Sequence, residues 1–209
     1  MANAGKKGSS PAIRKLAFIG MFAAIAAVLM FLEFPLPFAP AFYKLDFSEI
    51  PVLIGTFSFG PVAGVVCEFV KILVKTVIKG TSTAFVGELA NFAIGCAFIV
   101  PAGIIYKLKK TKKGALIGLG TGTLVMTVAG CFINAFVMLP VYAAAFHMPI
   151  DALVDMGHAV NGNVTNLFTF VMLCVAPFNL LKGVVDSVLT FFLYKRISRL
   201  IKSAAVQNP

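Results

Sequence analysis

The stretch AIRKLAFIGMFAAIAAVLMFL, residues 12–32, carries its two charged side chains, Arg14 and Lys15, near its start and is otherwise apolar. A helix needs about 20 mostly apolar residues to cross a bilayer, so this stretch is long enough. The composition of the whole chain also indicates a membrane protein, because its 209 residues are 59% hydrophobic and 12% charged. Soluble domains carry roughly a quarter charged residues. The sequence therefore predicts an all-α membrane protein.

The formal charge of +10 is concentrated beside the apolar segments. Three basic patches flank such segments and contain no acidic residue, which is the pattern of cytoplasmic loops. We expect them to face cytoplasm and anionic headgroups rather than nucleic acid. The patches are Lys6, Lys7, Arg14 and Lys15; Lys107, Lys109, Lys110, Lys112 and Lys113; and Lys195, Arg196, Arg199 and Lys202.

The order of apolar segments predicts six membrane-spanning helices with both chain ends cytoplasmic. One domain, 12–203, lies between polar tails at 1–11 and 204–209, and its first helix is expected to act as the membrane signal. A sixth span starting at Asn166 would need roughly 35 residues to reach the last patch, too long for one crossing. We therefore start it at Pro177 and assign 164–175 to an outer apolar element. The expected spans are 12–32, 47–59, 61–78, 88–106, 114–142 and about 177–199.

Between the first two spans lies PLPFAPAFYKLDFSEIP, residues 35–51, which we call the strap. It combines four prolines with aromatic side chains and with Lys44, Asp46 and Glu49. Prolines restrict the free segment and so reduce the cost of ordering it on binding. Aromatic rings offer flat apolar area. The strap is therefore predicted to be part of an outward-facing site for a flat small molecule.

Three intramembrane polar residues, Asn134, Asn179 and Lys182, are expected at the same depth beneath the strap. Asn179 and Lys182 are three residues apart and share a helical face. Amides donate and accept while a lysine only donates, so the trio could recognise a ring edge of alternating carbonyls and nitrogens. A competing interpretation is that Lys182 reaches outward or pairs with Asp186.

Other polar groups leave alternatives open. A charged stripe on the third segment either lines a cavity or pairs internally; it consists of Glu68, Lys71, Lys75 and Lys79. Glu33 and Glu88 fall at helix ends, although Glu88 together with Asn91 could face the cavity. In the first segment, the small-residue pairs Gly20/Ala24 and Ala23/Ala27 allow another helix to approach closely, from the same bundle or from a partner.

A polar loop after the fifth span holds His147, Asp151, Asp155 and His158 at spacings that could line one helical face. Such a face could bind Zn²⁺, but an amphipathic cap helix beginning near Pro149 fits as well, and we expect no metal. The four cysteines are scattered singly, as free thiols would be. We find no catalytic constellation and no phosphate-binding glycine motif, so no enzymatic activity is expected.

Five stretches together resemble the riboflavin-binding S-component of energy-coupling factor transporters, the RibU family. They are the strap, FGPVAGVVCEFVK at 59–71, GELANF at 87–92, NAFVMLPVY at 134–142 and PFNLLKG at 177–183. The resemblance runs over nearly the whole chain. It implies a high-affinity riboflavin-binding subunit of the bacterial cell membrane, with no cofactor beyond the transported vitamin. Whether FMN also binds stays open.

The resemblance also implies residue roles. Asn134, Asn179 and Lys182 would contact the flavin, and the strap residues Leu45, Asp46 and Phe47 would cover it. Ala23 and Ala27 would dock on a transmembrane T-component, and two ATPase subunits would supply the energy. The alternatives are an S-component for another vitamin, a stand-alone ion-coupled carrier using Glu68 and Lys71, and an intramembrane metalloenzyme using the His147–His158 loop.

Overall fold

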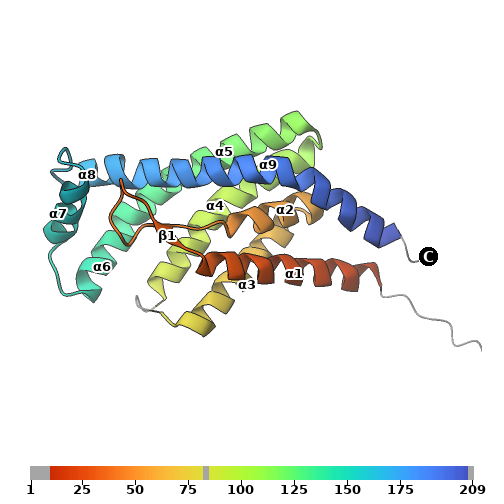
Figure 1. Ribbon diagram of the computed structural model, residues 1–209, viewed down its shortest axis with the longest axis horizontal. Coiled ribbons are helices and arrows are strands. Elements are labelled where there is room, and N and C mark those ends of the chain that lie inside the picture. Colours follow the sequence, from red (N-terminus) through yellow and green to blue (C-terminus); the bar gives the residue numbers. More distant parts are fainter. Residues whose placement is uncertain (1–9, 82–84, 207–209) are drawn as a thin grey trace, which may run out of the picture.

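A computed structural model describes residues 10–81 and 85–206. Parts of both predicted tails, including Lys6 and Lys7, lie outside this range. In the described residues the chain forms seven helical runs and one two-stranded ribbon (Figure 1). The runs are α1 (Pro11–Phe31), α2 (Glu49–Phe59), α3 (Pro61–Lys79), α4 (Val86–Leu108), α5 (Lys112–Ile133) continuing through η1 (Asn134–Met138) into α6 (Leu139–Ala145), α7 (Ile150–Val160), and α8 (Leu167–Phe170) continuing through η2 (Val171–Val175) into α9 (Ala176–Val206).

The prediction of an all-α membrane bundle is confirmed in its coarse form. Four runs are long and apolar enough to cross a bilayer: Ala12–Phe31, Val86–Leu108, Lys112–Ala145 and Leu167–Arg199. The 11-residue α2 is too short by this measure, and α3 carries the charged stripe. Six crossings therefore stay a prediction for α2 and α3, and α7 is an additional short helix outside the six.

The predicted break before the sixth span is wrong. Residues 167–206 form one uninterrupted helical run, so the segment at 164–175 is mostly its first turns. Asn166 and Thr169 start the run with a reciprocal capping box. The first turns of this run pack against α7, where Phe170 and Val154 share a core cluster.

Two π-helical turns interrupt the regular α-helical pattern, and each ends two residues before a proline. η1 precedes Pro140, and η2 precedes Pro177. Proline cannot donate the backbone hydrogen bond of a regular helix, and a wider turn accommodates it without ending the helix. The sequence predicts a helix start at Pro177, whereas in the structure this proline lies inside the helical run.

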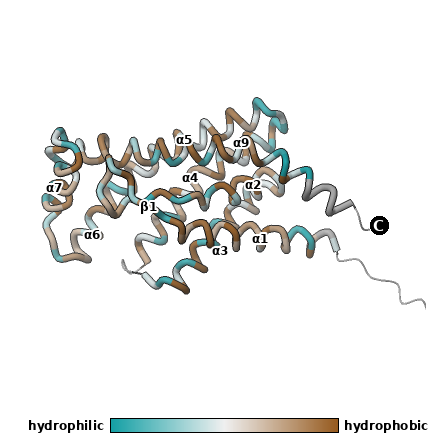
Figure 2. Tube along the Cα trace, viewed as in Figure 1, coloured by the Kyte–Doolittle hydropathy of each residue, from teal (hydrophilic) through white to brown (hydrophobic). Residues whose placement is uncertain are grey.

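Helices α1 and α9 run along the long axis of the molecule, and α3 and α4 cross it obliquely (Figure 1). The start of α1, the α4–α5 turn and the end of α9 lie at one end, and the strap and α7 lie at the other. The described parts of all three basic patches are therefore at one end, with brown apolar tube between the two ends (Figure 2). Helices α4 and α5 approach closely: a Cβ on Gly118 would lie 2.8 Å from the Ala102 carbonyl oxygen.

The strap folds back as a narrow ribbon. Its β1 strand (Phe34–Pro35) pairs antiparallel with β2 (Lys44–Leu45), and its last residues form the first turn of α2. Tyr43 joins a buried cluster with residues of α6, α7 and the α8–α9 run. The strap is thus packed onto the end of the bundle at which it lies.

Candidate ligand-binding site

Two adjoining cavities lie beneath the strap. The outer cavity has a volume of about 670 Å³ and the deep cavity about 160 Å³. Both are lined by Phe42 and Asp46 of the strap, Asn91 of α4 and Tyr142 of α6, so one opens onto the other. Small-molecule sites are typically 300–1,000 Å³, and this hollow falls within that range.

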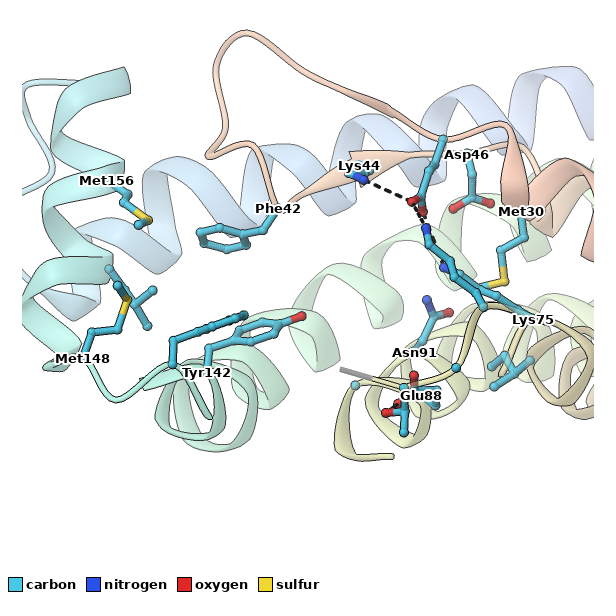
Figure 3. Close-up of a pocket in the computed structure, with 18 residues that line it drawn as sticks. Met30, Phe42, Lys44, Asp46, Lys75, Glu88, Asn91, Tyr142, Met148 and Met156 are labelled. Carbon is cyan, nitrogen blue, oxygen red and sulfur yellow. Dashed lines mark hydrogen bonds and ion pairs between the residues drawn. The ribbon is translucent and has the colours of Figure 1, made fainter. Parts of the chain in front are cut away.

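The outer cavity has chemically different ends (Figure 3). One end presents Phe42 and Tyr142, whose ring centroids are 5.8 Å apart at an interplanar angle of 50°, beside Met148 and Met156. Aromatic and thioether groups of this kind suit a flat apolar ligand surface. The sequence did not single out any of these four residues, because they come from the strap, α6, the next loop and α7.

The opposite end of the outer cavity is charged and centres on Glu33, which sequence analysis placed only at a helix end. Glu33 Oε1 lies 2.6 Å from Lys79 Nζ and 3.1 Å from Lys44 Nζ, and Glu33 Oε2 lies 3.4 Å from Lys75 Nζ. Partial burial acts to raise the pKa of Glu33, but the lysines outweigh it and hold this pKa at about 2. The cluster ties the end of α1 to the strap and α3.

Asn134, Asn179 and Lys182 meet in the deep cavity, as the sequence predicted from their depth. Asn134 Nδ2 donates to the Gly130 carbonyl at 2.8 Å, and Asn179 Nδ2 donates to the Val175 carbonyl at 3.0 Å. Each amide NH₂ has two donors, so each keeps one N–H after bonding its own helix. That second donor is what a ligand's edge could use.

Tyr43 was not predicted and holds the strap against this amide pair. Its hydroxyl donates to Asn134 Oδ1 at 2.8 Å in a buried contact. Burial raises the pKa of Tyr43 well above its ordinary value, so the hydroxyl keeps its proton and acts as a donor. A tyrosine within an aromatic strap is a weak signal by itself; only the fold shows its partner.

Lys182 fastens the strap to α9. Its Nζ donates to the Asp46 carbonyl at 2.9 Å and to Asp46 Oδ2 at 3.1 Å, and lies 3.7 Å from Asp186 Oδ2. The pairing with Asp186 considered from the sequence is therefore present, alongside a closer one. Burial alone would raise the pKa of Asp46, but Lys182, Lys71 and the Ser48 N–H lower it to about 2.

The charged stripe of α3 was expected either to line a cavity or to pair internally, and the structure shows both. Lys71 is fully buried and pairs internally, 2.7 Å from both Glu49 and Glu68. Its Nζ also donates to Ser48 Oγ at 3.2 Å. Lys75 and Lys79 instead line the outer cavity through the Glu33 cluster, so the inner half of the stripe is structural and the outer half faces the site.

The other predicted ligand residues are placed differently from one another. Glu88 and Asn91 line the outer cavity, and Asn91 reaches the deep one. Leu45 is buried, and the Phe47 ring lies 5.9 Å from that of Phe34; neither of these strap residues lines the two cavities. Their place is in packing the strap, and a contact with ligand stays a prediction.

The small residues of α1 separate into two faces. Ala23 and Ala27 are buried inside the bundle and do not lie on its surface. Gly20 and Ala24 are exposed on the outer face, and nothing lies within 4 Å of a Cβ placed on Gly20. In this structure only the Gly20/Ala24 pair is accessible to a partner helix.

The polar loop forms the cap helix α7. His147 precedes that helix with a positive φ of 52°, so the four acidic and histidine side chains do not share one face. His158 Nδ1 lies 2.8 Å from the Val164 carbonyl oxygen, which ties α7 to the following loop. Among the described residues, no three His, Cys, Asp or Glu side chains are grouped to hold a metal.

Comparisons with known proteins agree with this geometry. The family model for the ECF transporter, substrate-specific component, matches residues 14–194. The chain is 37% identical over 189 residues to the riboflavin transporter RibU of Staphylococcus aureus (strain TCH60), covering 90% of this chain and 93% of that protein. It is 34% identical to the riboflavin transporter FmnP of Bacillus subtilis (strain 168), covering 88% and 92%.

A solved structure of the S component of a bacterial ECF transporter superposes with a TM-score of 0.72 at 36% identity. The superposition covers 90% of this chain and 98% of that one. The residues matched by the family model, 14–194, include the strap, both π turns and the residues that line both cavities. The chain belongs to the family of substrate-specific components of ECF transporters.

Proposed function

We propose that this chain is the riboflavin-capturing subunit of a vitamin uptake transporter. The observation that carries the proposal is the cavity of about 670 Å³ whose aromatic end opens onto the amide and lysine donors of the deep cavity. A flavin needs both a flat apolar surface and polar partners for its ring edge. The two similar proteins named as riboflavin transporters support this choice over another vitamin.

The site's parts take distinct roles in this proposal. Phe42 and Tyr142 pack against the ring system, and Asn134, Asn179 and Lys182 serve its polar edge. The Glu33 cluster and Asn91 lie where ribityl hydroxyls would find donors and acceptors. The chain binds and releases the vitamin; it is not an enzyme, and the energy comes from partner subunits.

The expected orientation in the membrane follows from the positions of the basic patches. The basic patches share one end of the bundle, so that end and both termini face the cytoplasm while the strap faces outward. A transmembrane T-component with two ATPase subunits would complete the transporter in the bacterial cell membrane. The exposed Gly20/Ala24 face of α1 is the part of the predicted docking surface open to it.

The first test is the visible absorption spectrum of the detergent-purified chain before and after denaturation. Flavin bands, with riboflavin released on unfolding, are expected. A colourless preparation that also fails to quench the fluorescence of added riboflavin would overturn the proposal and direct the search to other vitamins.

A further inference from the structure

A third cavity lies at the opposite end of the bundle from the strap. It has a volume of about 350 Å³ and is bounded by α1, the α2–α3 turn and the end of α4. Lys15, Lys107 and Lys110 line it, and none of its described lining residues is acidic. These lysines come from two different basic patches that only the fold brings together. We call this hollow the basic cavity.

Further groups in the basic cavity favour an anion. Its floor includes Gly60, Pro61 and Val62 at the start of the 19-residue α3, where the positive end of the helix dipole points outward. Ser58 also lines it, although its buried hydroxyl has no hydrogen-bond partner among the described residues. Three lysines and a helix start thus border a single hollow.

The surroundings identify the kind of anion. Val62, which lines the cavity, is 77% exposed. An apolar side chain this exposed at the end of a membrane bundle suits an acyl chain. Basic hollows between helices on the cytoplasmic side commonly hold anionic lipid headgroups. A free phosphate would use the charges and leave Val62 uncovered.

We infer that the basic cavity binds the phosphate headgroup of an anionic phospholipid, with an acyl chain along the exposed Val62 side chain. The inference does not depend on which vitamin the strap site takes. It gives the basic patches an additional role, because three of their lysines form a discrete site instead of a diffuse attraction to the membrane surface.

The test compares two triple variants of equal charge change. Lys15→Gln, Lys107→Gln and Lys110→Gln empty the cavity of its lysines; Lys109→Gln, Lys112→Gln and Lys113→Gln alter basic residues outside it. Purified protein is titrated with phosphatidylglycerol or phosphatidylcholine, and bound lipid is counted by native mass spectrometry. Thermal unfolding in the detergent micelles used for purification checks that both variants fold.

We expect wild type and the control triple to retain one phosphatidylglycerol and to prefer it over phosphatidylcholine. The cavity triple should need at least about tenfold more phosphatidylglycerol for the same occupancy, or about 1.4 kcal/mol. Equal loss in both triples, or no loss in either, would overturn the inference. So would displacement of the lipid by millimolar inorganic phosphate, since the site would then take a free anion. If the cavity triple does not fold, the single Lys110→Gln variant decides in the same way.

Discussion

The contact between Lys182 and Asp46, which we call the strap latch, holds the strap to α9. Replacing Lys182 with methionine tests whether this latch controls riboflavin affinity. Methionine keeps much of the apolar stem of lysine and removes the ammonium group. Two hydrogen bonds to Asp46, at 2.9 and 3.1 Å, would be lost, together with the 3.7 Å ion pair to Asp186. Among the described residues, no other hydrogen bond or ion pair joins the strap to α9.

The expected loss of riboflavin affinity in Lys182→Met follows from the burial of Lys182 and Asp46. Lys182 is 9% exposed and Asp46 8% exposed. Removing one partner of a buried ion pair costs about 3–5 kcal/mol, because the other charge is left unpaired. Asp46 retains the hydrogen bond from the Ser48 N–H at 2.9 Å, which favours the lower end of that range. Since about 1.4 kcal/mol is tenfold in affinity, riboflavin should bind at least tenfold more weakly.

Quenching of riboflavin fluorescence measures this affinity directly. Lys113→Met, an exposed lysine at the far end of the bundle, is the matched control and should keep wild-type affinity. Adding Asp46→Asn to Lys182→Met removes the unpaired carboxylate and should recover part of the loss. A folded Lys182→Met protein that binds riboflavin within twofold of wild type would refute the latch.

Three further predictions concern the same end of the molecule. Asn134→Ala should weaken riboflavin binding at least tenfold, about 1.4 kcal/mol, in the same titration; wild-type affinity would exclude the amide from the site. Gly130→Ala would place a Cβ 2.7 Å from Asn179 Nδ2 and should also reduce affinity about tenfold, whereas Gly120→Ala, with nothing within 4 Å, should not. Because the pKa of Asp46 falls from 3.8 to about 2 on folding, its contribution to stability is complete above pH 4 and is lost as pH falls toward 2. Thermal unfolding against pH should therefore be flatter in that window for Asp46→Asn, and parallel curves would contradict this.

Much of the site could be predicted because the depth of a residue in the membrane follows from its position along an apolar segment. Asn134, Asn179 and Lys182 were placed together by counting residues from segment ends, since each residue advances a helix by a fixed rise. The same counting failed at Pro177, where it assumed that a helix must end within the bilayer. The π turn η2 and the packing of α8 on α7 remove that limit.

Side-chain partners far apart in the chain could not be predicted, because only the fold brings their segments together. Glu33 binds lysines from the strap and α3, and Tyr43 reaches Asn134 across 91 positions. Two small-residue pairs looked equivalent in α1, yet the helix rotation buries Ala23 and leaves Ala24 exposed. A periodic pattern shows which residues share a face and leaves open what that face meets.

The sequence by itself determined the membrane class, the clustering of charge beside apolar segments and the three polar residues of the deep cavity. These follow from hydropathy and helical rise, which are local properties. The tertiary structure alone decided how the strap is fastened, which cavities exist and how three lysines from two patches come to share one hollow. Cavities and buried ion pairs are properties of the space between elements, and packing sets that space.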